Sequence, residues 1–300
     1  MRVTNKMMAN LVTANLRRNA ERLAASHERL STGRRLNRPS DDPSALSRAL
    51  SVRRTIGENE QYMRNIDNAS GWLSATDVAL ARVGDLVTRA SDLAARGAND
   101  TLGAEQRTAM AGEVTQLLED LLQVANSSHG DDYLFAGVEQ GQAPYTADDP
   151  LLPTNVTYQG AGKLERTIGA DAKMAINPAD GGDAFEFAPG RTVFDALISL
   201  RDALLANDQA TISASLDDLD SAQTHVSSLR AAIGAKVTRL QHAGDQLKAG
   251  QVEMQAQLSK DQDLDVAEEL MNYSTGETTY KAALGTAAKT LMPSLIDYLT

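Results

Sequence analysis

The chain of 300 residues has no cysteine and few aromatic residues, which narrows both its chemistry and its packing. Without cysteine it can form no disulfide, no thiolate nucleophile and no cysteine-bound metal site. It has one tryptophan, seven tyrosines and four phenylalanines, and every phenylalanine lies between residues 135 and 194. Because aromatic side chains usually fill thick globular cores, we expect thin helical packing outside that range.

Long apolar runs are also missing. No window of the sequence is apolar enough to span a membrane, and charged residues from Arg17 to Arg22 interrupt the only apolar stretch of the first thirty residues. We therefore expect neither membrane insertion nor a cleaved signal peptide. From residue 55 onward 17 Lys and Arg stand against 36 Asp and Glu, a net charge of −19 that disfavours broad nucleic-acid binding.

The two ends of the chain carry apolar stripes and opposite charge. Residues 1–54 hold 12 Lys and Arg against 4 Asp and Glu, whereas residues 261–300 hold 2 against 7, giving net charges of +8 and −5. Near the start, apolar residues recur every seven residues, and near the finish they recur in steps of three and four residues. Short helices cannot bury such stripes alone, so we predict that they pair with each other and with neighbouring copies. The candidate interface residues are Leu16, Leu23, Leu30, Leu270, Tyr280, Leu284 and Leu291.

Stop and start signals divide the first third of the chain. The pattern predicts a first helix from about 5 to 30, ended by Gly33 in the left-handed conformation. Asp42 is placed as the N-cap and Pro43 as the first residue of a second helix. An apolar ladder then continues to Gly97. One face of this second helix is therefore expected to pack.

Three further helical segments and one β-rich segment follow. Apolar spacing predicts a short third helix near 114–125, a fourth near 194–205, and a long ladder from 212 to 258 that would extend roughly 70 Å. Between them, residues 133–192 are rich in Gly, Pro, aromatic and β-branched residues, which is typical of short strands and turns.

The predicted fold class is therefore mainly α: an elongated rod of long antiparallel helices with coiled-coil termini and a small β-rich insert. We predict a terminal domain of residues 1–42 and 261–300 and a long-helix bundle of residues 43–132 and 193–260. The inserted domain takes residues 133–192.

No motif carries convincing chemistry. The four histidines lack ligand spacing, and Asp261, Asp263 and Asp265 lack the Gly and Glu of a calcium loop, so we expect a solvated acidic helix start there. The segment 160–163 lacks the Ser or Thr of a phosphate loop and is interpreted as a hairpin turn. We predict no catalytic, metal or cofactor site. An enzyme would instead need convergent polar groups in the insert around Tyr158 and Phe185.

The turn after the first helix is basic and then acidic. Arg34, Arg35 and Arg38 precede Asp41 and Asp42 within a few residues, without interleaved aromatic residues. A phosphate-binding cluster would suit the arginines alone. The nearby carboxylates favour a local or inter-subunit charge contact instead.

This same turn resembles the junction after the first helix in bacterial flagellins and flagellin-like hook-associated proteins. The matching run extends from Leu30 to Pro43, and the closing run from Ser294 to Leu299 also resembles that family. The motif residues are Gly33, Arg34, Asn37, Pro39, Asp41, Asp42 and Pro43. Within the family, the opening Arg2–Asn5, the Tyr133–Gly137 run and Trp72 look like the hook-associated protein 3 branch, whereas a flagellin more usually has a Phe-Asn-Gly sequence at the second place.

The resemblance implies a structural role without a reaction or cofactor. It implies a homo-oligomeric ring that joins hook-associated protein 1 to the flagellin filament outside the cell. It also implies passage through the flagellar type III export channel, with a cytoplasmic chaperone holding the C-terminal region. The alternatives are a flagellin, or a cytoplasmic helical scaffold or signalling coiled coil that would form stable dimers with ordered ends.

Overall fold

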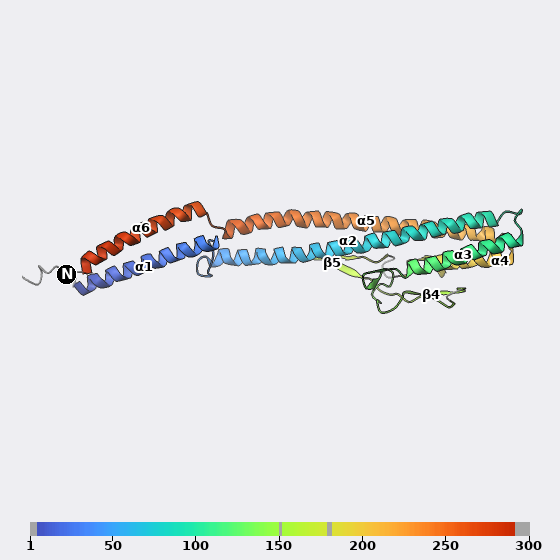
Figure 1. Ribbon diagram of the computed structural model, residues 1–300, viewed down its shortest axis with the longest axis horizontal. Coiled ribbons are helices and arrows are strands. Elements are labelled where there is room, and N and C mark those ends of the chain that lie inside the picture. Colours follow the sequence, from blue (N-terminus) through green and yellow to red (C-terminus); the bar gives the residue numbers. More distant parts are fainter. Residues whose placement is uncertain (1–4, 150–151, 179–181, 292–300) are drawn as a thin grey trace, which may run out of the picture. The chain divides into compact units, whose positions relative to one another are not determined.

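The computed structural model describes residues 5–149, 152–178 and 182–291 (Figure 1). Within these ranges three helices are followed by eight short strands and then by three more helices. The helices are α1 Asn5–Thr32, α2 Pro43–Gly97, α3 Ala104–Ala125, α4 Val193–Ala206, α5 Gln209–Gln262 and α6 Val266–Leu291. The strands are β1 Ser128–His129, β2 Asp132–Tyr133, β3 Tyr145–Ala147, β4 Val156–Tyr158, β5 Glu165–Gly169, β6 Ala172–Ala175, β7 Glu186–Ala188 and β8 Arg191–Thr192.

The chain divides into two compact units. The terminal unit takes residues 1–58 and 249–300, and the second unit takes residues 59–248, so the residues of the β-rich insert share a unit with the helices around them. The predicted division into three domains stays a prediction.

The predicted signals at the α1–α2 turn are confirmed. Gly33 follows α1 with a φ of 67°, a conformation in which a side chain would be strained. Asp42 Oδ1 accepts the backbone N–H groups of Ser44 at 3.1 Å and Ala45 at 3.0 Å, which satisfies two donors in the first turn of α2. The local sequence therefore defines where α1 ends and α2 begins.

The core of the second unit follows the apolar ladders. The predicted ladder residues of α2 are buried from Ile66 to Ala94. Helices α3 and α4 pack beside each other, and their buried apolar residues belong to the same core. The ladder residues of α2 are Ile66, Ala69, Leu73, Thr76, Leu80, Val83, Val87, Ala90 and Ala94. Spacing in the sequence therefore determined which face of the helix is buried.

The described residues between α3 and α4 form four separate two-stranded antiparallel pairs, β1–β2, β3–β4, β5–β6 and β7–β8, of which β1–β2 begins before the predicted insert. Phe135, Tyr145, Phe185 and Phe194 form its core, with neighbouring ring centroids 5.1 to 5.8 Å apart. The β5–β6 hairpin lies on α2, where Asn65 Nδ2 donates to the Thr167 carbonyl at 2.7 Å. The aromatic residues are therefore concentrated where strands, rather than long helices, supply the packing.

The predicted hairpin turn at residues 160–163 is wrong. The strand before it, β4, pairs with β3, and the strand after it, β5, pairs with β6, so the segment connects two hairpins. Its Ala161 instead lies beside Gly137, and the Val138 N–H donates to the Ala161 carbonyl at 2.8 Å. Local turn composition could not reveal this partner because pairing over twenty residues depends on the whole insert.

Candidate assembly interface

The two terminal helices lie side by side and run antiparallel (Figure 1). From the α1 side, Leu23 faces Gly276, where a Cβ atom would lie 3.7 Å from Leu23 Cδ1. The rings of His27 and Tyr273 are 6.2 Å apart. The structure therefore brings the two predicted stripes together along one seam.

The candidate residues differ in how far this seam covers them. Leu16, Leu23, Leu30 and Tyr280 are half-buried. Leu270 and Leu284 keep 53% and 44% of their surface exposed, so pairing with α1 does not bury them. The side chain of Leu291 and the run Ser294–Leu299 lie outside the described residues. An interface role for these side chains remains a proposal.

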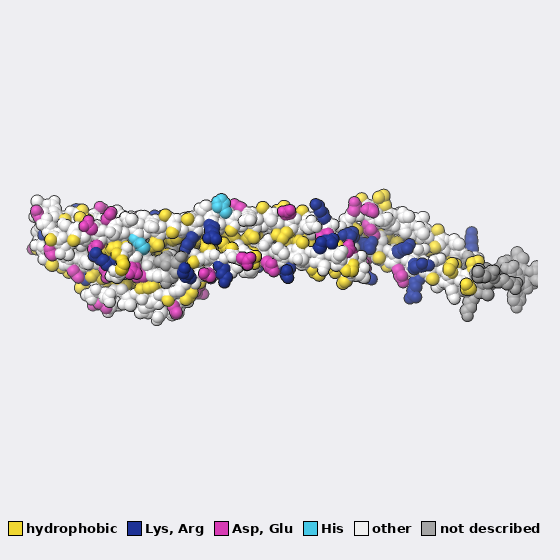
Figure 2. Space-filling view, turned by 180° about the vertical axis from the view of Figure 1, so that it is seen from behind, with side chains coloured by type: hydrophobic (Ala, Val, Ile, Leu, Met, Phe, Trp, Pro, Cys, Tyr) yellow, Lys and Arg dark blue, Asp and Glu magenta, His cyan; other side chains and the backbone are white. Residues whose placement is uncertain are grey.

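Several other apolar side chains of the terminal unit are exposed. Figure 2 shows apolar side chains scattered between charged ones along the visible face of the molecule. The exposed large apolar residues of this unit include Met7, Met8, Leu11, Leu50, Val252, Val266, Leu270, Met271 and Leu284. Single exposed apolar residues are ordinary, but seven of these lie on α1 and α6, the helices that carry the predicted stripes.

Charge contributes less to the seam than the net charges of the ends suggest. Within the described residues, one ion pair crosses between α1 and α6, joining Arg29 and Glu269 at 3.9 Å. Such a pair, with Arg29 partly exposed, contributes about 0 to 1 kcal/mol. Apolar packing therefore dominates the contact between these two helices.

Backbone hydrogen bonds between distant segments lie where α1 ends and α6 begins. We name residues 33–36 together with residues 261–264 the clasp. The Arg35 N–H donates to the Gln262 carbonyl at 2.8 Å, and the Leu264 N–H donates to the Gly33 carbonyl at 3.2 Å. Leu36 is buried within it. Two segments more than 220 residues apart are thereby joined by backbone hydrogen bonds.

Arginine side chains complete the clasp. Arg35 Nη2 donates to the Asp261 carbonyl at 2.7 Å, Arg48 Nη2 lies 3.2 Å from Asp261 Oδ1, and Arg53 Nη2 donates to Gln262 Oε1 at 2.5 Å. The hydrogen bond from Arg48, followed by one from Gln257, lowers the pKa of Asp261 below its usual value.

The expectation of a solvated acidic helix start is therefore wrong for Asp261. It lies at the end of α5 and is buried, as is Gln262. No local pattern points to Arg48, Arg53 or Gln262, because their partners are more than 200 positions away in the chain.

The family turn is held by one carboxylate. Asp41 Oδ2 accepts the backbone N–H groups of Asn37 at 3.0 Å and Arg38 at 2.9 Å, and these bonds and nearby arginines lower its pKa. Arg38 Nη2 lies 2.7 Å from Glu28 Oε2 on α1, whereas the backbone of Arg34 forms an isolated antiparallel β-bridge with Asp263. Arg38 therefore makes a local charge contact, and Arg34 and Arg35 contact a segment that is distant in the sequence. Pro39 is exposed at the tip of the turn.

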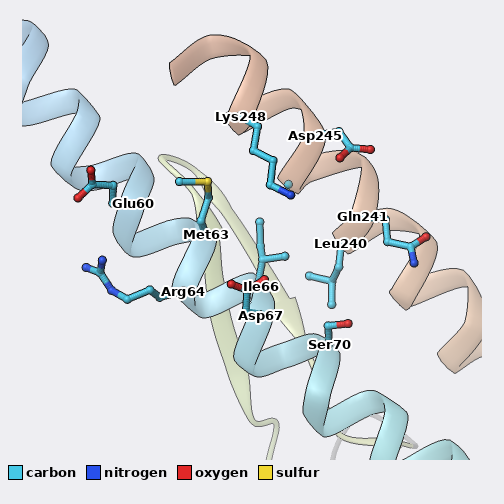
Figure 3. Close-up of a pocket in the computed structure, with 11 residues that line it drawn as sticks. Glu60, Met63, Arg64, Ile66, Asp67, Ser70, Leu240, Gln241, Asp245 and Lys248 are labelled. Atoms are coloured by element: carbon cyan, nitrogen blue, oxygen red, sulfur yellow. The ribbon is translucent and has the colours of Figure 1, made fainter. Parts of the chain in front are cut away.

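The second unit has an open groove between α2 and α5. In Figure 3, Met63, Ile66 and Leu240 lie between the two helices, and Lys248 reaches across from α5. Gly244 lines this groove on the α5 side, and a Cβ atom there would make an ordinary contact 3.8 Å from Ile66 Cγ2. A few buried polar side-chain atoms in the described residues have no hydrogen-bond partner. None of them belongs to a residue that lines this groove.

Polar groups lie close together near Tyr158 and Phe185, the region expected to hold the active site if the protein were an enzyme. Asp183 Oδ1 accepts the Tyr145 hydroxyl at 2.6 Å and the Phe185 N–H at 2.8 Å. Burial raises the pKa of Asp183 and of Tyr145, and raises the pKa of Tyr158 to about 12. These groups satisfy one another inside the aromatic core, so the arrangement is explained by packing.

Among the described residues, no helix has an apolar stretch that could span a membrane. The same residues contain no group of three or more His, Asp or Glu side chains that could hold a metal ion.

Two family models match the two parts of the sequence that contain the terminal helices. The sequence model of the bacterial flagellin N-terminal helical region matches residues 3–140, and that of the bacterial flagellin C-terminal helical region matches residues 216–299. These matches contain α1, α6 and both sides of the clasp. The chain belongs to the flagellin superfamily. The predicted family resemblance, including the one to hook-associated protein 3, is confirmed.

Individual members of the superfamily are similar over most of the chain. Flagellar hook-associated protein 3 of Escherichia coli (strain K12) is 24% identical over 282 residues, covering 85% of this chain and 87% of that protein. Flagellin of Bacillus subtilis (strain 168) is 28% identical over 303 residues, covering 94% of each. The structure of the flagellar junction protein from Legionella pneumophila superposes with a TM-score of 0.57 at 15% identity, covering 72% of this chain and 100% of that one. The predicted mainly α, flagellin-like fold is confirmed.

Proposed function

We propose that this protein is a structural component of the bacterial flagellum that forms a junction between hook-associated protein 1 and the flagellin filament. Membership of the superfamily and the similarity to hook-associated protein 3 support the role. The observation that carries it is the antiparallel α1–α6 pair with exposed Leu270 and Leu284. The proposed role requires that neighbouring subunits cover these exposed side chains, so that the protein acts by assembly rather than by a reaction.

The proposal includes a ring of copies outside the cell. Each copy would be exported through the flagellar type III channel without a cleaved signal peptide, with a cytoplasmic chaperone holding the C-terminal region. Helices that expose one apolar stripe are marginal in isolation, which suits transport through a narrow channel. Contacts with neighbouring copies, hook-associated protein 1 and flagellin would then order them.

A deletion strain tests the role. Loss of the gene should leave hooks that carry hook-associated protein 1 while flagellin is secreted unpolymerised. Electron microscopy of the hooks and immunoblots of the medium measure both outcomes. Short but attached filaments would contradict the junction role and indicate a minor flagellin, which is the second candidate because flagellins are comparably similar in sequence.

Two substitutions separate assembly from folding of the terminal pair. Leu284→Asp changes an exposed side chain, so the free protein should stay folded while incorporation into the flagellum is lost. Each buried leucine contributes about 1.5 to 3 kcal/mol, and the loss repeats in every copy of a ring. Leu23→Asp should disturb the α1–α6 seam as well. Leu205→Asp, at an exposed leucine of α4, is the matched control. Normal incorporation of the Leu284 variant would contradict the interface.

A further inference from the structure

Five glycines lie inside the helices of the second unit at positions where a side chain would fit. They are Gly71 and Gly84 in α2, Gly112 in α3, and Gly234 and Gly244 in α5. At Gly112 and Gly234, a Cβ atom would meet no described atom within 4 Å beyond the nearest turns of its own helix. At Gly71, Gly84 and Gly244 it would make ordinary contacts at 3.8, 3.6 and 3.8 Å. Packing therefore requires glycine at none of the five positions.

Other glycines of the same unit do meet a geometric requirement. Gly97 ends α2, and a Cβ atom there would lie 2.7 Å from Leu204 Cδ2. Gly137 has a φ of 69° and closely faces the Ala161 carbonyl. Glycine is thus placed at a helix end and in a loop where the backbone or its neighbours require it, and the glycines inside the helices need another explanation.

Glycine inside a helix lowers the stability of that helix. It loses more conformational freedom on folding than any other residue, so replacing an interior alanine by glycine disfavours the helix by about fivefold in the folding equilibrium. The methyl groups of five alanines would touch different residues: His129 beside Gly71, Gln223 and Val226 beside Gly84, and Ile66 beside Gly244. Because these sites share no contact, the effects of the five glycines should add.

We propose that these five glycines are a built-in weakness that lets the second unit unfold readily for transport out of the cell. The inference rests on the proposed export through a narrow channel. A bundle of several helices is wider than a single helix of about 10 to 12 Å, so α2, α3 and α5 must separate before such a channel admits the chain. These helices share one apolar core, whose stability opposes that step.

The first arm of the test measures stability in the full-length chain. All five glycines are replaced by alanine: Gly71→Ala, Gly84→Ala, Gly112→Ala, Gly234→Ala and Gly244→Ala. Thermal unfolding followed by circular dichroism should show a Tm higher by roughly 10 °C or more, since each alanine should add about 2 to 4 °C. The single substitutions at Gly112 and Gly234, where the space is open, should each show that smaller increase. An unchanged or lower Tm in the five-alanine variant would overturn the proposal.

The second arm measures secretion into the medium by immunoblot. A strain without hook-associated protein 1 is used, so that exported copies are not retained by assembly. At equal amounts inside the cell, the five-alanine variant should be secreted at least about threefold less than the unaltered chain. A compensated variant adds Leu118→Ala, at a fully buried leucine of α3, because such a change lowers stability by about as much as the five alanines raise it. Both Tm and secretion should then return, although all five methyl groups remain.

The compensated variant separates stability from surface contacts. Normal secretion of the five-alanine variant despite its higher Tm would overturn the role in transport. Secretion that stays low in the compensated variant after Tm has returned would overturn it as well, because the methyl groups would then block a contact instead of adding stability. Failure of the proposed function has a different outcome: the unaltered chain would itself be absent from the medium, and the thermal arm would still decide whether the glycines weaken the unit.

Discussion

Arg107 offers a sharp test of how the turns of the second unit are held. It lies on α3, has only 6% of its surface exposed, and donates to three uncharged oxygens. Its Nε donates to the Gly97 carbonyl at 2.9 Å, its Nη2 to the Asn99 carbonyl at 3.0 Å, and its Nη1 to Asn207 Oδ1. Gly97 ends α2 and Asn207 caps the end of α4, so the guanidinium lies at the carboxyl ends of two helices. The negative ends of both helix dipoles stabilise its charge.

The substitution Arg107→Met fills most of the same volume and removes all three hydrogen bonds. Each hydrogen bond to a charged group contributes about 1.5 to 3 kcal/mol, but the carbonyl groups of an outer turn can regain water, so we expect a net loss of about 2 to 4 kcal/mol. For a unit of this size that corresponds to a fall in Tm of roughly 5 to 15 °C. Arg107→Lys keeps the charge without the planar fork and should lose about half as much.

Thermal and urea unfolding followed by circular dichroism measure these changes. Arg89→Met is the matched control, since Arg89 pairs with Glu113 between the neighbouring helices α2 and α3 with nearly half of its side chain exposed. Such a pair should contribute at most about 1 kcal/mol. Hydrogen exchange should also rise in both turns of the Arg107 variant. Equal losses for the two methionine variants would refute the reasoning.

Three further perturbations follow from local geometry. Burial raises the pKa of Asp183 in the folded state, so its charge costs stability as pH rises through that range, and Asp183→Asn should raise Tm at pH 7 but not at pH 4. In Gly137→Ala the new Cβ atom would overlap the Ala161 carbonyl at a backbone φ of 69°, so this variant should lose more unfolding free energy than Gly130→Ala. Gly130 has a φ of 66° and open space around it, and its alanine variant should lose only about 1 to 2 kcal/mol of unfolding free energy. The pKa of Asp261 is lowered, so its contribution is complete above about pH 4 and disappears at more acid pH, where hydrogen exchange at residues 33–36 should increase. Equal losses for the two glycines, a pH-independent change at Asp183, or unchanged exchange in acid would each contradict its prediction.

The sequence by itself determined the order of the helices, the boundary between α1 and α2 and the buried face of α2, but it missed the first ten residues of α3, which begins at Ala104. The Asp42–Pro43 signal and the ladder from Ile66 to Ala94 act over one to four residues, and helix geometry makes such spacing readable without knowledge of any partner. The family turn could be found for the same reason, since Asp41 bonds to residues only three and four positions before it.

Only the tertiary structure decided what those faces meet. It placed Leu23 in the seam and left Leu284 exposed, although both belong to similar stripes. It also brought Arg35 and Arg48 to Asp261, and Arg107 to two separate turns. These contacts join residues up to 226 positions apart, and the energy of such a contact depends on the final path of the chain rather than on spacing.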